Sequence, residues 1–216
     1  MGFNAATRLV SELQNRLKRQ FGDESGVQIT DSDIVSWIND GMRELNRINK
    51  VFKSVSTTNS VAGQNEYTFP GVNIVSVEQL YYDNAPVEYR SYNNVQELIL
   101  RAADALTTTG QALVWYEFGG SLFIYPTPSE SDKVIKLLCV VAPTLVMNST
   151  DVIPLPDDYY EALYQYCVAQ AYETDDDMKA ATAKTQQYAN TLTQIESRSH
   201  DEQYYPMITV DAEDAY

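Results

Sequence analysis

The spacing of apolar residues changes twice along this chain, and that change restricts its possible folds more than any other feature. Near both ends apolar residues recur every three or four positions, as on a helix, whereas in the middle they alternate as on a strand. Apolar helical stripes from both ends need partners, so we expect one bundle. The sequence therefore predicts an α+β fold, with a helical bundle from 1–60 and 150–197, an inserted antiparallel β domain at 61–149, and an extended C-terminal arm at 198–216.

The expected helices have recognisable ends. The first begins with Asn4 as its N-cap and ends before Gly22, and the second begins near Thr30, where acids suit the positive helix N-terminus. The helix after Pro156 is apolar on nearly all sides, so we expect it to be central. The predicted helical ranges are about 4–21, 30–52, 157–173 and 178–197.

The middle of the chain predicts strands joined by tight turns. The clearest hairpin has Gly119 and Gly120 as its two-residue turn. Residues 54–65 are rich in Ser, Thr and Gly and precede the first predicted strand, and 93–110 predicts a short helix beneath a Thr-rich loop. The predicted strands lie at 67–70, 74–82, 87–89, 111–118, 121–126 and 134–142.

The charge balance argues against tight nucleic-acid binding. The 216 residues include 30 Asp and Glu against 15 Lys and Arg, which gives a net charge of −15. Proteins that grip phosphates need Lys and Arg to release counterions, but an acidic surface suits DNA that slides past without sticking. No apolar stretch predicts a membrane span, and the N-terminus lacks the apolar run of a signal peptide. Cys139 and Cys167 lack disulfide-framework or zinc-ribbon spacing, which indicates a reducing compartment.

The residues that usually carry catalysis are sparse, so the sequence predicts neither an enzyme nor a bound cofactor or metal. The one histidine, His200, lies beyond the last predicted helix, and Gly119-Gly120 has no following lysine to bind phosphate. Asp157 and Asp158, and the run 175–177, are better explained as helix caps than as metal ligands.

Charge is separated along the chain, and we interpret this as two complementary surfaces. Opposite patches of this kind suit a ring whose neighbouring copies meet head to tail, and an acidic surface also suits a DNA channel. The expected acidic channel or inter-subunit surface consists of Asp151, Asp157, Asp158, Glu161, Asp175, Asp176 and Asp177. The expected basic inter-subunit surface on the first helix consists of Arg8, Arg16, Lys18 and Arg19.

The C-terminal arm has no periodicity, but it contains a short apolar group between acids. Such a segment suits docking in a groove or along a sheet edge of a large partner. We expect the arm to dock on a large partner through Tyr204, Tyr205, Pro206, Met207, Ile208 and Val210.

Several pieces, in order, resemble the head-to-tail adaptor (connector) proteins of tailed bacteriophages. The second helix carries SDIVSWINDGMREL at 32–45, and AGQNEYTFP at 62–70 resembles the first strand of that family. LYYDNAPV at 80–87 resembles the following hairpin. The resemblance is completed by LFIYPTP at 122–128 and IPLPDDYYEAL at 153–163, and together it covers about 5–197.

This resemblance implies a structural protein of the virion neck, assembled in the host cytoplasm. It implies a homo-oligomeric ring of about twelve copies that docks on the portal protein above and on a tail, nozzle or stopper protein below. The portal is then the expected partner of the C-terminal arm. DNA would pass through the ring without sequence-specific binding, during genome retention and ejection, and no membrane would be involved. The family implies no catalytic residues.

Two other functions remain open from the residues alone. The 16 tyrosines and 2 tryptophans would suit a carbohydrate- or peptidoglycan-binding module, because sugars stack on aromatic rings. Against this, the aromatic residues of the β region alternate as a buried face would. A metal-dependent hydrolase using Asp157 and Asp158 is the third possibility.

Overall fold

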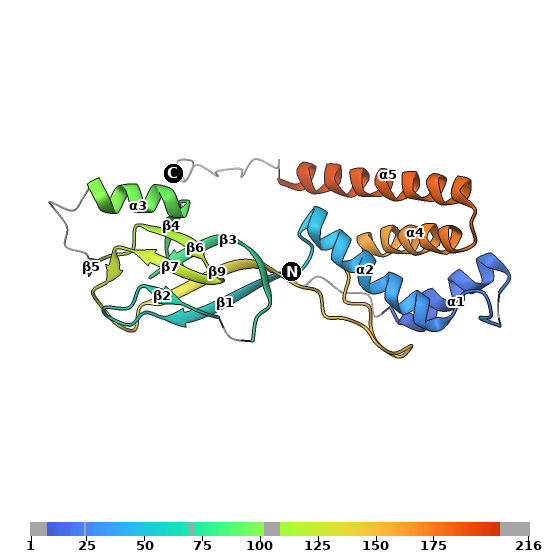
Figure 1. Cartoon of the computed structure of the whole chain (residues 1–216), viewed down its shortest axis with the longest axis horizontal. Helices are drawn as coiled ribbons and strands as arrows, with labels where there is room; N and C mark the ends of the chain where they lie inside the picture. The colour runs from blue at the N-terminus through green and yellow to red at the C-terminus, as the bar shows by residue number, and fades with distance from the viewer. Residues whose placement is uncertain (1–7, 24, 70, 102–108, 204–216) are drawn as a thin grey trace, which may run out of the picture. The chain divides into compact units, whose positions relative to one another are not determined.

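The computed structural model describes residues 8–23, 25–69, 71–101 and 109–203, and only the backbone at 101 and 198–203. The chain forms two compact units (Figure 1). The helical unit combines Met1–Asn49 with Pro143–Tyr216, and the β unit is Lys50–Ala142. The predicted α+β class, with helices from both chain ends, is confirmed.

The helical unit is built around its third helix. The described helices of this unit are α1 (Val10–Phe21), α2 (Asp31–Asn49), α4 (Asp157–Thr174) and α5 (Met178–Gln203). Helix α4 contacts each of the other three, and eight of its residues are buried. The expectation that this apolar helix is central is therefore confirmed.

Most helix ends follow the local signals in the sequence. Thr30 and Asp33 exchange hydrogen bonds at the start of α2, where the Thr30 amide donates to the Asp33 carboxylate and the Asp33 amide to the Thr30 hydroxyl. Gly22 ends α1 in the left-handed conformation at φ 66°. The Asp177 carboxylate accepts the Ala180 amide at 3.0 Å and so caps α5.

Two predicted helix limits are wrong. Helix α1 begins at Val10, not at residue 4, because Leu9 forms a bridge with Val152 and the Val10 amide donates to the Asp151 carbonyl at 3.0 Å. A tertiary contact therefore replaces the expected Asn4 cap, which lies outside the described residues. Helix α5 continues to Gln203, so the arm predicted to begin at 198 is helical over its first six residues.

Asn39 and Gly41 on α2 explain part of the SDIVSWINDGMREL pattern. The Asn39 amide group pairs with both backbone groups of Val146, at 2.9 Å each, and so ties the returning chain to α2. At Gly41 the packing of α2 on α4 leaves no room for a side chain. A Cβ atom there would lie 2.6 Å from Leu163 Cδ1 and 2.9 Å from Tyr166 Cδ1.

The loop between α1 and α2 is organised by one carboxylate. Asp23 accepts the backbone amides of Val27, Gln28 and Ile29 and the Ser25 hydroxyl, at 2.9–3.1 Å. These hydrogen bonds, that of Ile29 above all, lower the pKa of Asp23 to about 2. The loop therefore depends on an ionised Asp23.

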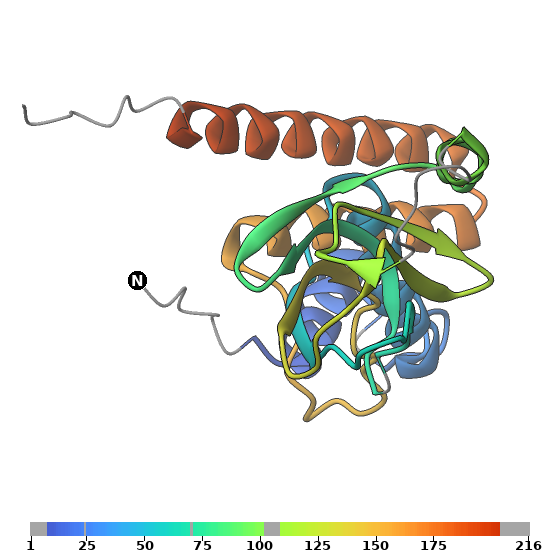
Figure 2. The same ribbon diagram turned by 90° about the vertical axis from the view of Figure 1, so that its left-hand side faces the viewer.

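The β unit contains a seven-stranded, mostly antiparallel sheet that curls around its own core (Figure 2). The strand order is β1-β9-β3-β4-β6-β7-β2. These strands are β1 (Lys53–Asn59), β2 (Glu66–Tyr67), β3 (Ile74–Tyr82), β4 (Ala85–Tyr89), β6 (Val114–Phe118), β7 (Ser121–Tyr125) and β9 (Val134–Val141). A separate parallel pair is formed by β5 (Thr109–Gly110) and β8 (Thr127–Pro128).

Strand β1 was not predicted from the sequence, and the β unit begins and ends earlier than predicted. Lys53–Asn59 pairs with β9 over its whole length, yet its side chains alternate only between partly buried and exposed. An edge strand of this kind carries Ser and Thr in place of apolar residues, so it resembles a loop in sequence. The compact unit accordingly begins at Lys50 and ends at Ala142, whereas the sequence placed the inserted domain at 61–149.

The predicted hairpin of β6 and β7 is confirmed, and both of its faces are covered. Gly119 and Gly120 form its turn with φ of 62° and 85°. Trp115 points into the sheet core, whereas Val114 and Tyr116 pack with Val95 of α3 (Tyr92–Arg101). The predicted short helix is therefore present, and residues 102–108 of its Thr-rich loop lie outside the described residues.

We predict that Gly41→Ala destabilises the helical unit by about 1–3 kcal/mol, because the added methyl group overpacks the contact with Leu163 and Tyr166. Ser36→Ala, at an exposed position of the same helix, is the control and should leave stability nearly unchanged. Chemical denaturation measures both. A Gly41→Ala variant more stable than the parent would mean that the α2–α4 contact is looser than described.

We also predict that Asp23 makes stability fall as acid is added. Its pKa is lower in the folded chain, about 2, than in an unfolded one, about 3.9. Its contribution is therefore present above pH 4 and is lost as the pH falls towards 2. Thermal unfolding from pH 5 to 2 should show a weaker pH dependence for Asp23→Asn than for the parent, and a melting temperature several degrees lower at pH 7.

Candidate interaction surfaces

The predicted acidic and basic surfaces meet within one chain where α1 packs on α4. Arg16 binds Glu161 through both guanidinium nitrogens, at 2.9 and 3.3 Å, and lies 3.5 Å above the Tyr164 ring. Arg8 lies 3.4 Å from Asp157 and 4.6 Å above the Tyr160 ring.

The other two basic residues of that predicted surface differ from each other. Lys18 pairs with Asp31 of α2 at 2.8 Å, so it joins the two ends of the α1–α2 connection. Arg19 is exposed and forms no ion pair with any residue that the structure describes. Of the four basic residues, Arg19 is therefore the one without an ion-pair partner among the described residues.

The remaining predicted acids fall into two groups. Asp151 accepts the amides of Met147 and Asn148, at 2.7 and 2.9 Å, and these bonds lower its pKa, so it organises a turn. Asp158 is exposed on the first turn of α4, and Asp175, Asp176 and Asp177 are exposed between α4 and α5. The α4–α5 turn is thus the densest exposed acidic surface of the predicted set.

The predicted portal-binding residues lie outside the described part of the chain. Tyr204, Tyr205, Pro206, Met207, Ile208 and Val210 all follow Gln203, where α5 ends. His200 falls on α5, and its side chain is not described.

Most aromatic residues of the β unit are buried or partly buried, as their alternation indicated. Trp115, Tyr116 and Tyr82 are each at most 7% exposed. Tyr89, Tyr92 and Phe118 are the exceptions, and Tyr92 stacks on Phe118 with ring centroids 4.7 Å apart. These three rings would be the surface for a sugar, and the sequence did not single them out.

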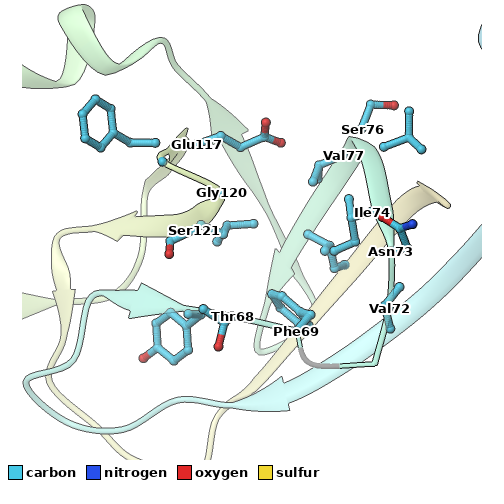
Figure 3. Close-up of a pocket in the computed structure, with 16 residues that line it drawn as sticks. Thr68, Phe69, Val72, Asn73, Ile74, Ser76, Val77, Glu117, Gly120 and Ser121 are labelled. Carbon is cyan, nitrogen blue, oxygen red and sulfur yellow. The ribbon is translucent and has the colours of Figure 1, made fainter. Parts of the chain in front are cut away.

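A cleft of about 580 Å³ opens in the β unit between β3 and the β6–β7 turn (Figure 3). Ile74 and Val77 of β3 line one side, Gly120 and Ser121 line the other, and Phe69 lies at one end. The sequence did not predict this site, because its walls come from segments more than forty positions apart.

The described residues hold no group of three or more side chains suited to bind a metal ion. Asp157, one of the two carboxylates considered for a hydrolase, is paired with Arg8. Both cysteines are buried and unpaired, and burial raises the pKa of each thiol. Neither thiol is suited to react as a thiolate.

We predict that Arg16→Ala lowers stability by about 1 kcal/mol, since it removes an exposed ion pair and a cation–π contact. Arg19→Ala removes an equally basic exposed residue of α1 and should change stability by much less. Thermal unfolding at low salt measures both variants. Equal losses would mean that general charge, and not the contact with α4, sets the effect of Arg16.

Comparison with known proteins shows which family the chain matches. A family model described as SU10 adaptor protein matches residues 8–210, a range that extends over both units. No curated protein matches the chain. Among the described residues, no helix is both long and apolar enough to cross a membrane.

Proposed function

Because the chain belongs to the SU10 adaptor protein family, we propose that it is a structural protein of a bacteriophage virion, without enzymatic activity, that joins the portal of the capsid to the tail. In this role about twelve copies form a ring around the DNA channel at the neck. The family match over residues 8–210 is the observation that carries the proposal.

The charges of the helical unit support a channel that DNA crosses without binding. The α4–α5 turn presents Asp175, Asp176 and Asp177 to solvent, and no Lys or Arg lies between residues 150 and 177. Carboxylates along a channel wall repel phosphate, so they favour passage during ejection over retention by contact.

The ion pairs between the first helical segment and α4 reduce the number of basic residues that we assign to the contact between copies. Arg8, Arg16 and Lys18 are each paired with a carboxylate of the same chain, so Arg19 is the first-helix residue that we assign to the acidic surface of a neighbour. The portal contact is assigned to residues 204–210, which follow the end of α5.

Assembly with a portal tests this function. The purified chain, mixed with the portal protein of the same phage, should form closed rings of about twelve copies on the portal, seen by electron microscopy and native mass spectrometry. A chain that stays monomeric and leaves the portal bare would contradict the proposal. Binding to a glycan array through Tyr89, Tyr92 and Phe118 would then favour the carbohydrate-binding alternative.

A further inference from the structure

The cleft of the β unit lies beside an open strand edge. Strand β3 pairs with β9 along its length but with β4 only from Leu80 to Tyr82. Over residues 74–79 its second edge has no strand beside it among the described residues. The Gln79 side chain marks the point of separation, because it donates to the carbonyls of Leu80 and Val87 at 2.9 and 3.0 Å.

The walls of this cleft are partly apolar, and they also carry the polar residues Thr68, Asn73, Ser76, Glu117 and Ser121. Val75 and Phe118 line it and remain 58% and 57% exposed. Across from β3, nothing lies within 4 Å of where Cβ atoms would stand at Gly119 and Gly120. An open strand edge with apolar side chains beside it is the arrangement that accepts an added strand, through backbone hydrogen bonds and alternate side chains.

The chain itself contains a segment with the matching pattern. Residues 204–210 read YYPMITV, so Tyr204, Pro206, Ile208 and Val210 share one face of an extended segment and are all apolar. Seven extended residues span roughly 23 Å, long enough to follow the open part of β3. Pro206 lacks an amide hydrogen, which an added edge strand tolerates.

We propose that the β-unit cleft holds residues 204–210 of a neighbouring copy as a strand added along β3, until a portal protein takes the segment up. This inference rests on the proposed ring, in which each copy gives its segment to the next and the contact closes on itself. The cleft and the portal compete for the same side chains. The cleft therefore keeps an apolar segment out of water before assembly. The segment leaves the cleft when the portal protein binds it more tightly.

Hydrogen exchange in rings of the full chain, without portal, tests the added strand. Amides at 74–79 should exchange on the order of tenfold faster in Ile208→Asp than in the parent. Thr209→Asp, on the opposite face of the segment, is the matched control and should leave exchange unchanged. A synthetic peptide of residues 204–216 should restore protection in Ile208→Asp. Unchanged exchange in Ile208→Asp, or equal effects of both variants, overturns the proposal.

A disulfide distinguishes a neighbouring copy from the same copy. Val75→Cys combined with Ile208→Cys should form covalent dimers and higher species on oxidation, because Cys139 and Cys167 are buried. Cross-linked monomers alone, or cross-links that form only after portal is added, overturn the assignment. If rings form on the portal but this cross-link does not form, only the cleft contact is rejected. If no rings form on the portal, the proposed function is rejected as well.

Discussion

The burial of α4 is the constraint on which the helical unit depends. This helix is apolar on nearly all sides, so one partner could not remove it from water. It packs against α1 and α2 from before the β unit and against α5 that follows it. The chain must therefore return to its first helices after the β unit, and Asn39 and the Leu9–Val152 bridge fasten the returning segment.

The same packing decides which charges can act outside the chain. Arg8 and Arg16 lie over tyrosine rings of α4 and form ion pairs with carboxylates of the same helix, so both take part in contacts within the chain. Exposed ion pairs contribute little stability, but they set the electrostatic surface. Arg19, Asp158 and the acidic α4–α5 turn are the exposed charges of the predicted patches that form no ion pair among the described residues.

The β unit leaves part of its sheet edge unpaired among the described residues. Strand β4 leaves β3 after Leu80 and joins β6 in parallel at Glu88 and Tyr89. The sheet can then curl around one core, at the cost of an unpaired stretch of β3 and partly exposed apolar side chains. Proteins normally protect such edges, so an open one beside a cleft is a place where another chain can pair.

Local patterns determined the helix and hairpin types, because caps, turns and hydrophobic periods act over a few residues. The capping residues Thr30 and Asp33, the C-cap Gly22 and the Gly119-Gly120 turn all act where the sequence placed them. Tertiary contacts decided the rest. The start of α1 depends on a bridge to Val152, β1 is recognisable only beside β9, and Arg16 meets Glu161 across 145 positions. Pairings over such separations depend on how the whole chain packs, which no short stretch of sequence specifies.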